Sequence, residues 1–320
     1  MKKHLRIIVG ILVTAMVIMA CSFQAVSTPG PDLAGTQVAL AQTQTALSNN
    51  PAQQPDDSNA QPTATFTQEQ EPPPPPPPAA LDIPALIDSA NILVYEDIIA
   101  DPAYIPYVKR ALNSVGGHQV YVADAMGTFM DKMNSGTQWD LIIMASEMRS
   151  KISGEYWTAL KDQVDNGVAL VSETWYLDQI SDGKIAPFLS ECGVKVQRDW
   201  VRKASYNRID YGMFWIDPSS PVFNTPNQVD RLSASLTNPA FSGAGTDIGD
   251  LMEVTDYSKA QILASLIQGN DTSYGVITSC MNGRVIMQTF DSHDYPTNEM
   301  VALWENYIIY TLTNHFQSMQ

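Results

Sequence analysis

The sequence is poor in positive charge. Its 320 residues contain 18 Lys and Arg against 34 Asp and Glu, a formal net charge of −16. A nucleic-acid binder needs a basic surface to neutralise phosphates, so that class of protein is excluded. Three cysteines are too few for a disulfide-dense scaffold. A hydrophobic fraction of 44% with six Trp excludes wholesale disorder and allows one large domain or two small ones.

The first 20 residues have the pattern of an export signal. Lys2, Lys3 and Arg6 precede an almost unbroken apolar run over residues 7–20. A run of about 14 apolar residues is short for a membrane span, which needs about 20, but it suits a signal peptide. An ordinary signal peptide followed by a chance cysteine, or an uncleaved anchor, are the alternatives.

The end of that run, Ile18-Met19-Ala20-Cys21, resembles the bacterial lipobox. The resemblance implies cleavage before Cys21 and a diacylglycerol on its thiol, so the partner would be the lipid bilayer. Removing residues 1–20 deletes three cations and no acid, which moves the formal charge from −16 to −19. Anionic headgroups repel such a body, and the lipid alone would hold it. The expected place is outside the cytoplasm, on the outer leaflet or the outer membrane.

Residues 21–80 are expected to form a lipidated, disordered stalk. Residues 22–80 contain no Lys or Arg, only five acids, and 12 of the 21 prolines. Such a segment cannot bury enough apolar surface to offset its ordering entropy. The run Pro72 to Pro78 predicts a polyproline II spacer, with a ligand for a proline-reading module as the alternative. A short helix is predicted over residues 36–47.

Residues 81–320 are expected to form the globular domain. Apolar strand runs alternate with amphipathic helices across short loops, which predicts an α/β fold with a mostly parallel sheet sandwiched by helices. The type I′ turn signal Asn282-Gly283 adds a C-terminal β-hairpin before a closing helix. Residues 217–249 are predicted to be loop-rich. The expected strands are residues 91–97, 119–123, 139–145, 168–172, 194–201, 262–267, 275–280 and 284–290. The expected helices are residues 102–115, 128–134, 155–164, 185–192 and 299–316.

This order of elements, the loop-rich insert and the ending Y-G-V-I…N-G-R-V-I-M-Q-T-F resemble the class I glutamine amidotransferase-like, flavodoxin-like superfold over residues 91–316. Active members carry Cys in a G-x-C-x-G elbow, where small neighbours permit a strained backbone. The matching stretch here, residues 171–175, reads V-S-E-T-W and has neither Cys nor Gly. His293-Asp294 lies in a similar late loop but lacks the family's His-x-Glu spacing. The resemblance therefore implies the fold without amidotransferase chemistry.

Acidic residues follow three of the expected strands. Glu96-Asp97, Glu147 and Glu173 would share one edge of a parallel sheet. Such an acidic edge suits a cation or polar ligand. A solvated acidic rim with no ligand is the alternative.

The late loop and one strand end supply weak catalytic candidates. His293, with Asp291 and Asp294, reads as a base, a metal ligand or a substrate contact. The competing interpretation is a capping loop in which Asp294 and Thr297 cap the last helix. Ser172 could be a nucleophile at a strand end, or a cap. No metal or cofactor is assigned.

Two cysteines remain besides Cys21. Outside the cytoplasm, Cys192 and Cys280 could form a disulfide. Two separate buried thiols are the alternative.

The sequence as a whole predicts a membrane-anchored surface lipoprotein whose domain is non-catalytic and serves binding or scaffolding, with an unknown ligand or envelope partner. One rival is an extracytoplasmic hydrolase that uses the acidic edge and His293. The other is a solute-binding lipoprotein, which is disfavoured because such receptors close two lobes around a ligand and only one is predicted.

Overall fold

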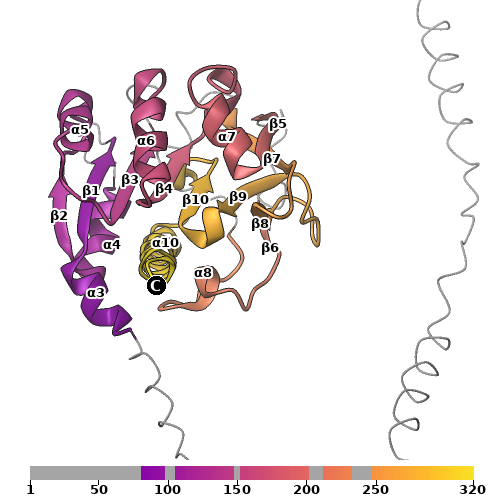
Figure 1. Ribbon diagram of the computed structural model, residues 1–320. Coiled ribbons are helices and arrows are strands. Elements are labelled where there is room, and N and C mark those ends of the chain that lie inside the picture. The colour runs from indigo at the N-terminus through magenta and orange to yellow at the C-terminus, as the bar shows by residue number, and fades with distance from the viewer. Residues whose placement is uncertain (1–80, 98–104, 148–151, 202–211, 233–246) are drawn as a thin grey trace, which may run out of the picture. The chain divides into compact units, whose positions relative to one another are not determined.

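The computed structural model describes residues 81–97, 105–147, 152–201, 212–232 and 247–320 (Figure 1). All of them belong to a compact unit over residues 76–320. The predicted signal peptide, Cys21 and the stalk lie outside the described residues. Among the helices that are described, none combines the length and apolar character needed to cross a membrane.

One half of the sheet is parallel. Its strands stand in the order β2-β1-β3-β4-β10, each parallel to its neighbours. Most of their residues are buried and apolar, as expected for a sheet covered on both faces. These strands are β1 (Asn91–Glu96), β2 (His118–Tyr121), β3 (Leu141–Ser146), β4 (Ala169–Thr174) and β10 (Val285–Gln288).

The other half of the sheet is antiparallel and larger than the predicted hairpin. β9 (Gly275–Cys280) pairs with β10, and β7 (Asp247–Val254) and β5 (Val194–Val201) continue the sheet. β8 (Ala260–Ser265) pairs with β9, and β6 (Phe214–Trp215) pairs with β8. The predicted α/β fold with a hairpin and a closing helix is confirmed. Residues 217–249, predicted to be loop-rich, include the start of β7, and β6 at residues 214–215 is not among the predicted strands.

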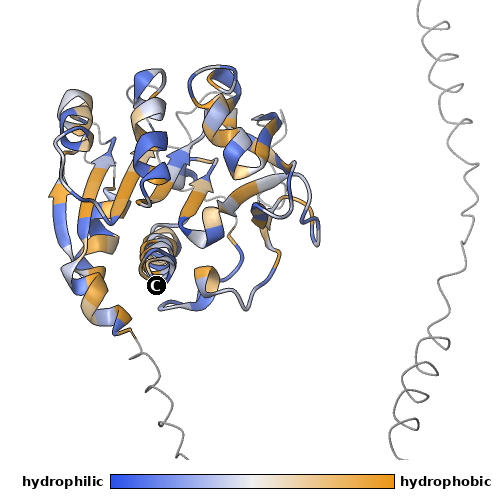
Figure 2. Ribbon diagram, in the orientation of Figure 1, coloured by the Kyte–Doolittle hydropathy of each residue, from blue (hydrophilic) through white to orange (hydrophobic). Residues whose placement is uncertain are grey.

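Helices cover both faces of the sheet (Figure 1). α3 (Ile83–Ser89), α4 (Tyr107–Val115) and α10 (Thr297–Ser318) pack on the face that carries Ile92 and Val94. α5 (Met126–Met133), α6 (Glu155–Asp165) and α7 (Ala186–Cys192) pack on the face that carries Leu93 and Tyr95. Figure 2 shows the strands between these layers as predominantly hydrophobic. The remaining short helices are α8 (Pro221–Asn224), η2 (Leu177–Gln179), η4 (Met281–Gly283) and η5 (Ser292–Asp294).

The turn of the β9–β10 hairpin has the predicted geometry. Asn282 and Gly283 take φ values of 56° and 84°, and the Arg284 amide donates to the Met281 carbonyl at 3.2 Å. Positive φ at both central residues defines the type I′ turn, which Asn-Gly favours. The dipeptide therefore fixes where the chain reverses beside β4.

Cys192 and Cys280 form a disulfide. It joins the end of α7 to the end of β9, with Cα atoms 5.3 Å apart, and both residues are buried. The sequence allowed either a disulfide or two separate buried thiols, and the structure shows the disulfide. The bond closes a loop between residues 88 positions apart.

Removing this disulfide is expected to lower the free energy of unfolding by about 2–5 kcal/mol, because the unfolded chain regains the entropy of the open loop. Urea unfolding of the double variant Cys192→Ser/Cys280→Ser, against the wild type, measures the effect. A reductant should shift the wild-type midpoint and leave the double variant unchanged. Equal midpoints for the oxidised wild type and the variant would contradict the prediction.

Candidate functional site

The predicted acidic residues meet at the carboxyl edge of the parallel strands. β2 lies on one side of β1 and β3 lies on the other, so the chain order switches direction between β1 and β3. Ligands of open α/β sheets bind at such a point. A cavity of about 10 Å³, near the least that holds one water molecule, lies there. It is lined by Glu96, Asp97, Ile105, Tyr107, Val108, Ala145, Glu147, Glu173 and His293.

The acidic edge is buried rather than solvated, which corrects the alternative drawn from the sequence. The exposed fractions are 4% for Glu96, 2% for Asp97, 5% for Glu147 and 1% for Glu173. Residues of α4 and of the segment after β10 line the same cavity and cover these carboxyls. Buried carboxyls need hydrogen-bond partners or protons, so their contacts decide what the site can do.

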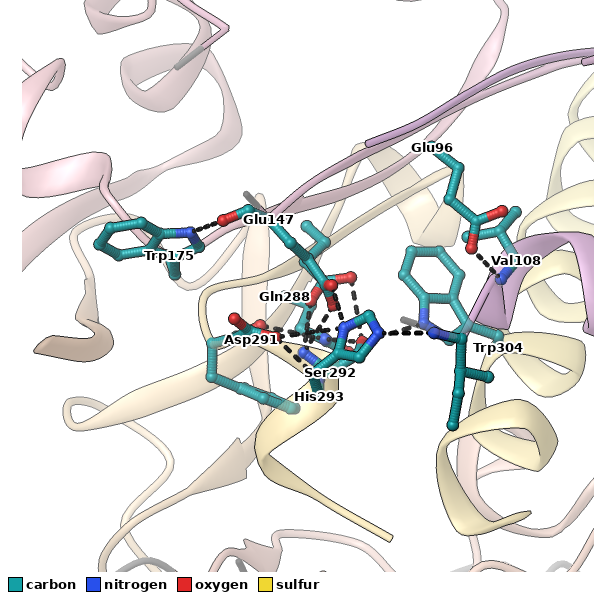
Figure 3. A network of polar contacts seen from close by, with 12 residues as sticks. Glu96, Val108, Glu147, Trp175, Gln288, Asp291, Ser292, His293 and Trp304 are labelled. Atoms are coloured by element: carbon teal, nitrogen blue, oxygen red, sulfur yellow. Dashed lines mark hydrogen bonds and ion pairs between the residues drawn. The ribbon is translucent and has the colours of Figure 1, made fainter. Parts of the chain in front are cut away.

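Ser292 stands at the centre of the polar network (Figure 3). Its backbone amide donates to Glu147 Oε1 at 3.0 Å and to Glu173 Oε1 at 2.6 Å. Its Oγ donates to Glu173 Oε2 at 3.0 Å. The same Oγ accepts from Gln288 Nε2 at 2.9 Å and from Trp304 Nε1 at 3.2 Å. The hydroxyl is therefore fully engaged.

Glu147 and Glu173 form a carboxyl pair, since both accept from the same Ser292 amide. Burial raises the pKa of both groups well above the ordinary value for Glu. The charge of Glu147 raises the pKa of Glu173 further, and the charge of Asp291 does the same for Glu147. Both shifts favour the protonated form of a carboxyl in this pair.

His293 is held at both ring nitrogens. The Ile105 amide donates to Nε2 at 3.0 Å, and Nδ1 contacts Glu147 Oε2. A backbone amide can only donate, so Nε2 must accept and Nδ1 must carry the hydrogen. Tyr107 packs its ring against the imidazole in an edge contact, with centroids 4.7 Å apart. The ring is therefore neutral and fixed in one tautomer.

The residue at the N-cap position of α10 is neither Asp294 nor Thr297. The N-cap of α10 is Pro296, which makes no side-chain capping bond. Asp291 instead caps η5, accepting from the His293 amide at 2.7 Å. Asp294 is buried within η5.

Glu96 has a role that the sequence did not indicate. Its carboxylate accepts from the Val108 amide at 2.8 Å, the Lys109 amide at 3.1 Å and the Tyr121 hydroxyl at 2.8 Å. A carboxylate at a helix N-terminus satisfies free amides and favours the helix dipole. Burial raises the Glu96 pKa, and these hydrogen bonds oppose that shift. Glu96 therefore fixes the first turn of α4.

Ser172 is not at a strand end. β4 continues to Thr174, and Ser172 is fully buried between Met144 and Met287 on the neighbouring strands. Side chains alternate along a strand, so Ser172 and Glu173 point to opposite faces. Trp175 donates from Nε1 to the Glu147 carbonyl at 2.5 Å and so links the ends of β3 and β4.

A metal does not fit the site in this form. Among the described residues, Glu147, Asp291 and His293 could bring three ligand atoms within 4.8 Å of one another. A ligating imidazole normally donates from its other nitrogen to an acceptor. His293 Nε2 instead faces the amide donor of Ile105, which leaves a hydrogen on Nδ1 where a lone pair would be needed.

Three residues of the polar network were not predicted from the sequence: Gln288, Trp304 and Tyr307. Gln288 receives a hydrogen bond from the Tyr307 hydroxyl at 3.1 Å, and Trp304 donates to Ser292. Burial raises the pKa of Tyr307. The sequence contained one indication of the role of Gln288, because it is the only side-chain amide in the mainly apolar run V-I-M-Q-T-F.

Comparison with known proteins gives no family model and no curated protein that matches the sequence. Among solved structures, the chain is similar to the glutaminase domain of Trypanosoma brucei CTPS with bound acivicin. The two are 9% identical with a TM-score of 0.40, and the alignment covers 71% of this chain and 95% of that one.

Proposed function

We propose that the chain is a lipid-anchored surface protein whose α/β domain binds a ligand or an envelope partner and does not turn over a substrate. One observation carries this proposal: the hydroxyl of Ser292 and the imidazole of His293, the nucleophile and the base that the strand edge would offer, are already engaged. Ser292 Oγ donates to Glu173 and accepts two bonds, and His293 Nε2 accepts from Ile105. A nucleophile needs a base within reach, and a base needs a free lone pair.

The sulfur chemistry supports the same proposal. Cys192 and Cys280 are joined, so neither offers a thiolate to attack a carbonyl. Disulfides persist mainly in oxidising compartments, which fits a domain displayed outside the cytoplasm.

The anchor is tested at Cys21. Cys21→Ser is expected to abolish incorporation of radiolabelled palmitate and to leave the chain unprocessed or released from the membrane, because the thiol is the proposed site of attachment. Cys192→Ser is the matched control and should leave labelling unchanged. Equal labelling of Cys21→Ser and wild type contradicts the anchor.

A hydrolase is the second candidate, and the carboxyl pair favours it. Two buried carboxyls with raised pKa values beside a histidine are the kind of acid–base set found at catalytic sites. The proposal of a binding protein predicts no turnover of esters, amides or glutamine above background by the full chain, with or without divalent metal. Turnover that disappears in His293→Ala, at an unchanged melting temperature, would establish the hydrolase instead.

A further inference from the structure

Two histidines of the described chain are equally buried but have opposite surroundings. His293 and His315 are each 2% exposed. His315 Nδ1 lies 3.0 Å from the Gly167 carbonyl, and its Nε2 lies 3.2 Å from Asp140 Oδ1. Both of these partners are acceptors. His293 has an acceptor, Glu147, at Nδ1 and a donor, the Ile105 amide, at Nε2.

This difference decides which protonation state each ring can adopt. A charged imidazole has an N–H at both nitrogens, and a neutral one has a single N–H. His315 can donate from both nitrogens, so gaining a proton breaks neither contact. A second proton on His293 would point from Nε2 at the hydrogen of the Ile105 amide, so that contact must break.

We propose that His293 holds the segment before α4 through a hydrogen bond that breaks when the ring gains a proton, and we call this contact the latch. In the neutral state its Nε2 lone pair holds the Ile105 amide. When a proton from solvent binds that lone pair, the N–H···N bond to Ile105 breaks, while the Nδ1–H contact with Glu147 is kept. Acidification therefore releases Ile105, two residues before the first turn of α4.

The latch controls access to the strand edge. Ile105, Tyr107 and Val108 line one side of the cavity, and the acidic residues line the other. Releasing Ile105 removes its part of that wall and gives solvent a path to the carboxyls, while Glu96 still holds the Val108 amide. This inference goes beyond the proposed function and holds whether the domain binds a ligand or turns one over. The titratable groups around the ring and its cavity are Glu96 of β1, Asp97 after β1, Glu147 after β3, Glu173 of β4, Tyr107 of α4, and Asp291 and Asp294 of its own loop.

Hydrogen exchange of the full chain tests the latch. After correction for intrinsic rates, lowering the pH from about 8 to about 5 should speed exchange of the Ile105 amide and the first turn of α4. The increase should be about tenfold, as expected for loss of one buried hydrogen bond. In His293→Gln the side-chain carbonyl can accept from Ile105 and the amide can donate to Glu147. Because that amide does not titrate, the acid response should disappear.

His315→Gln is the matched control, and its α4 segment should keep the wild-type acid response. Nitrogen NMR of histidine-labelled full chain at about pH 8 gives an independent readout and should place the His293 hydrogen on Nδ1. The proposal is overturned if wild-type exchange at Ile105 ignores pH, if His293→Gln retains the response, or if the hydrogen is on Nε2. If His293→Gln does not fold, the wild-type exchange, the His315→Gln control and the NMR assignment decide.

Discussion

Gly249→Ala is expected to lower the free energy of unfolding by about 3 kcal/mol or more, because the new methyl group meets backbone rather than a movable side chain. A Cβ at this position would lie 2.0 Å from the Thr289 carbonyl oxygen and 2.9 Å from the Phe290 Cα. That carbonyl accepts the Asp250 amide at 2.8 Å, and the Thr289 hydroxyl donates to the Asp250 carbonyl at 2.6 Å. Relieving the clash would separate β7 from the segment after β10 and break both bonds.

Urea unfolding of the full chain measures this effect, with Gly127→Ala as the control. Gly127 lies in α5, and a Cβ there meets nothing within 4 Å. Alanine at such a helical position is expected to be neutral or to stabilise by up to about 1 kcal/mol. Equal midpoints for the two variants would show that β7 does not approach Thr289 as described.

The effect of Glu173→Gln on the free energy of unfolding is expected to change sign as the pH rises. Burial raises the pKa of Glu173 above its ordinary value of 4.5 in the folded state. The folded chain then binds the proton more tightly than the unfolded chain. The stability from this group is fully present below the unfolded pKa and is lost as the pH rises through the folded pKa. The loss approaches about 1.4 kcal/mol per pH unit within that window.

Glutamine keeps an acceptor for the Ser292 amide and has no charge to bury. The variant should be less stable than wild type in acid, where the carboxyl network is intact. It should match or exceed wild type above the raised pKa. Unfolding free energies of both proteins across this range give the difference, and Glu155→Gln, at an exposed position, serves as the control. A difference between wild type and Glu173→Gln that is constant with pH would show that Glu173 stays charged when folded.

The parallel half of the sheet could be predicted because its strands are continuous apolar runs between helices of clear period. β7 could not, because Gly249 and the buried Asp250 interrupt its apolar pattern. Those two residues are there for tertiary reasons: one permits a close backbone approach, and the other accepts the Asp178 amide at 3.0 Å. α3 was missed because seven residues carry too little periodicity, although Asp82 caps it.

At the site, strand order was enough to predict that Glu96, Asp97, Glu147 and Glu173 share an edge. Their burial could not be predicted, because the cover comes from α4 and the segment after β10, which are distant in sequence. The tautomer of His293 depends on one amide 188 positions away. Local pattern contains no information about such a contact.

The two outer strands of the eight-strand path affect how copies of the molecule meet. β2 is only four residues long, and β5 is broken by two register shifts. Lys195, Arg198 and Asp199 of β5 are exposed. Short, bulged and charged edge strands resist pairing with a neighbouring sheet. Edges of this kind therefore oppose edge-to-edge aggregation of copies of the molecule at high concentration.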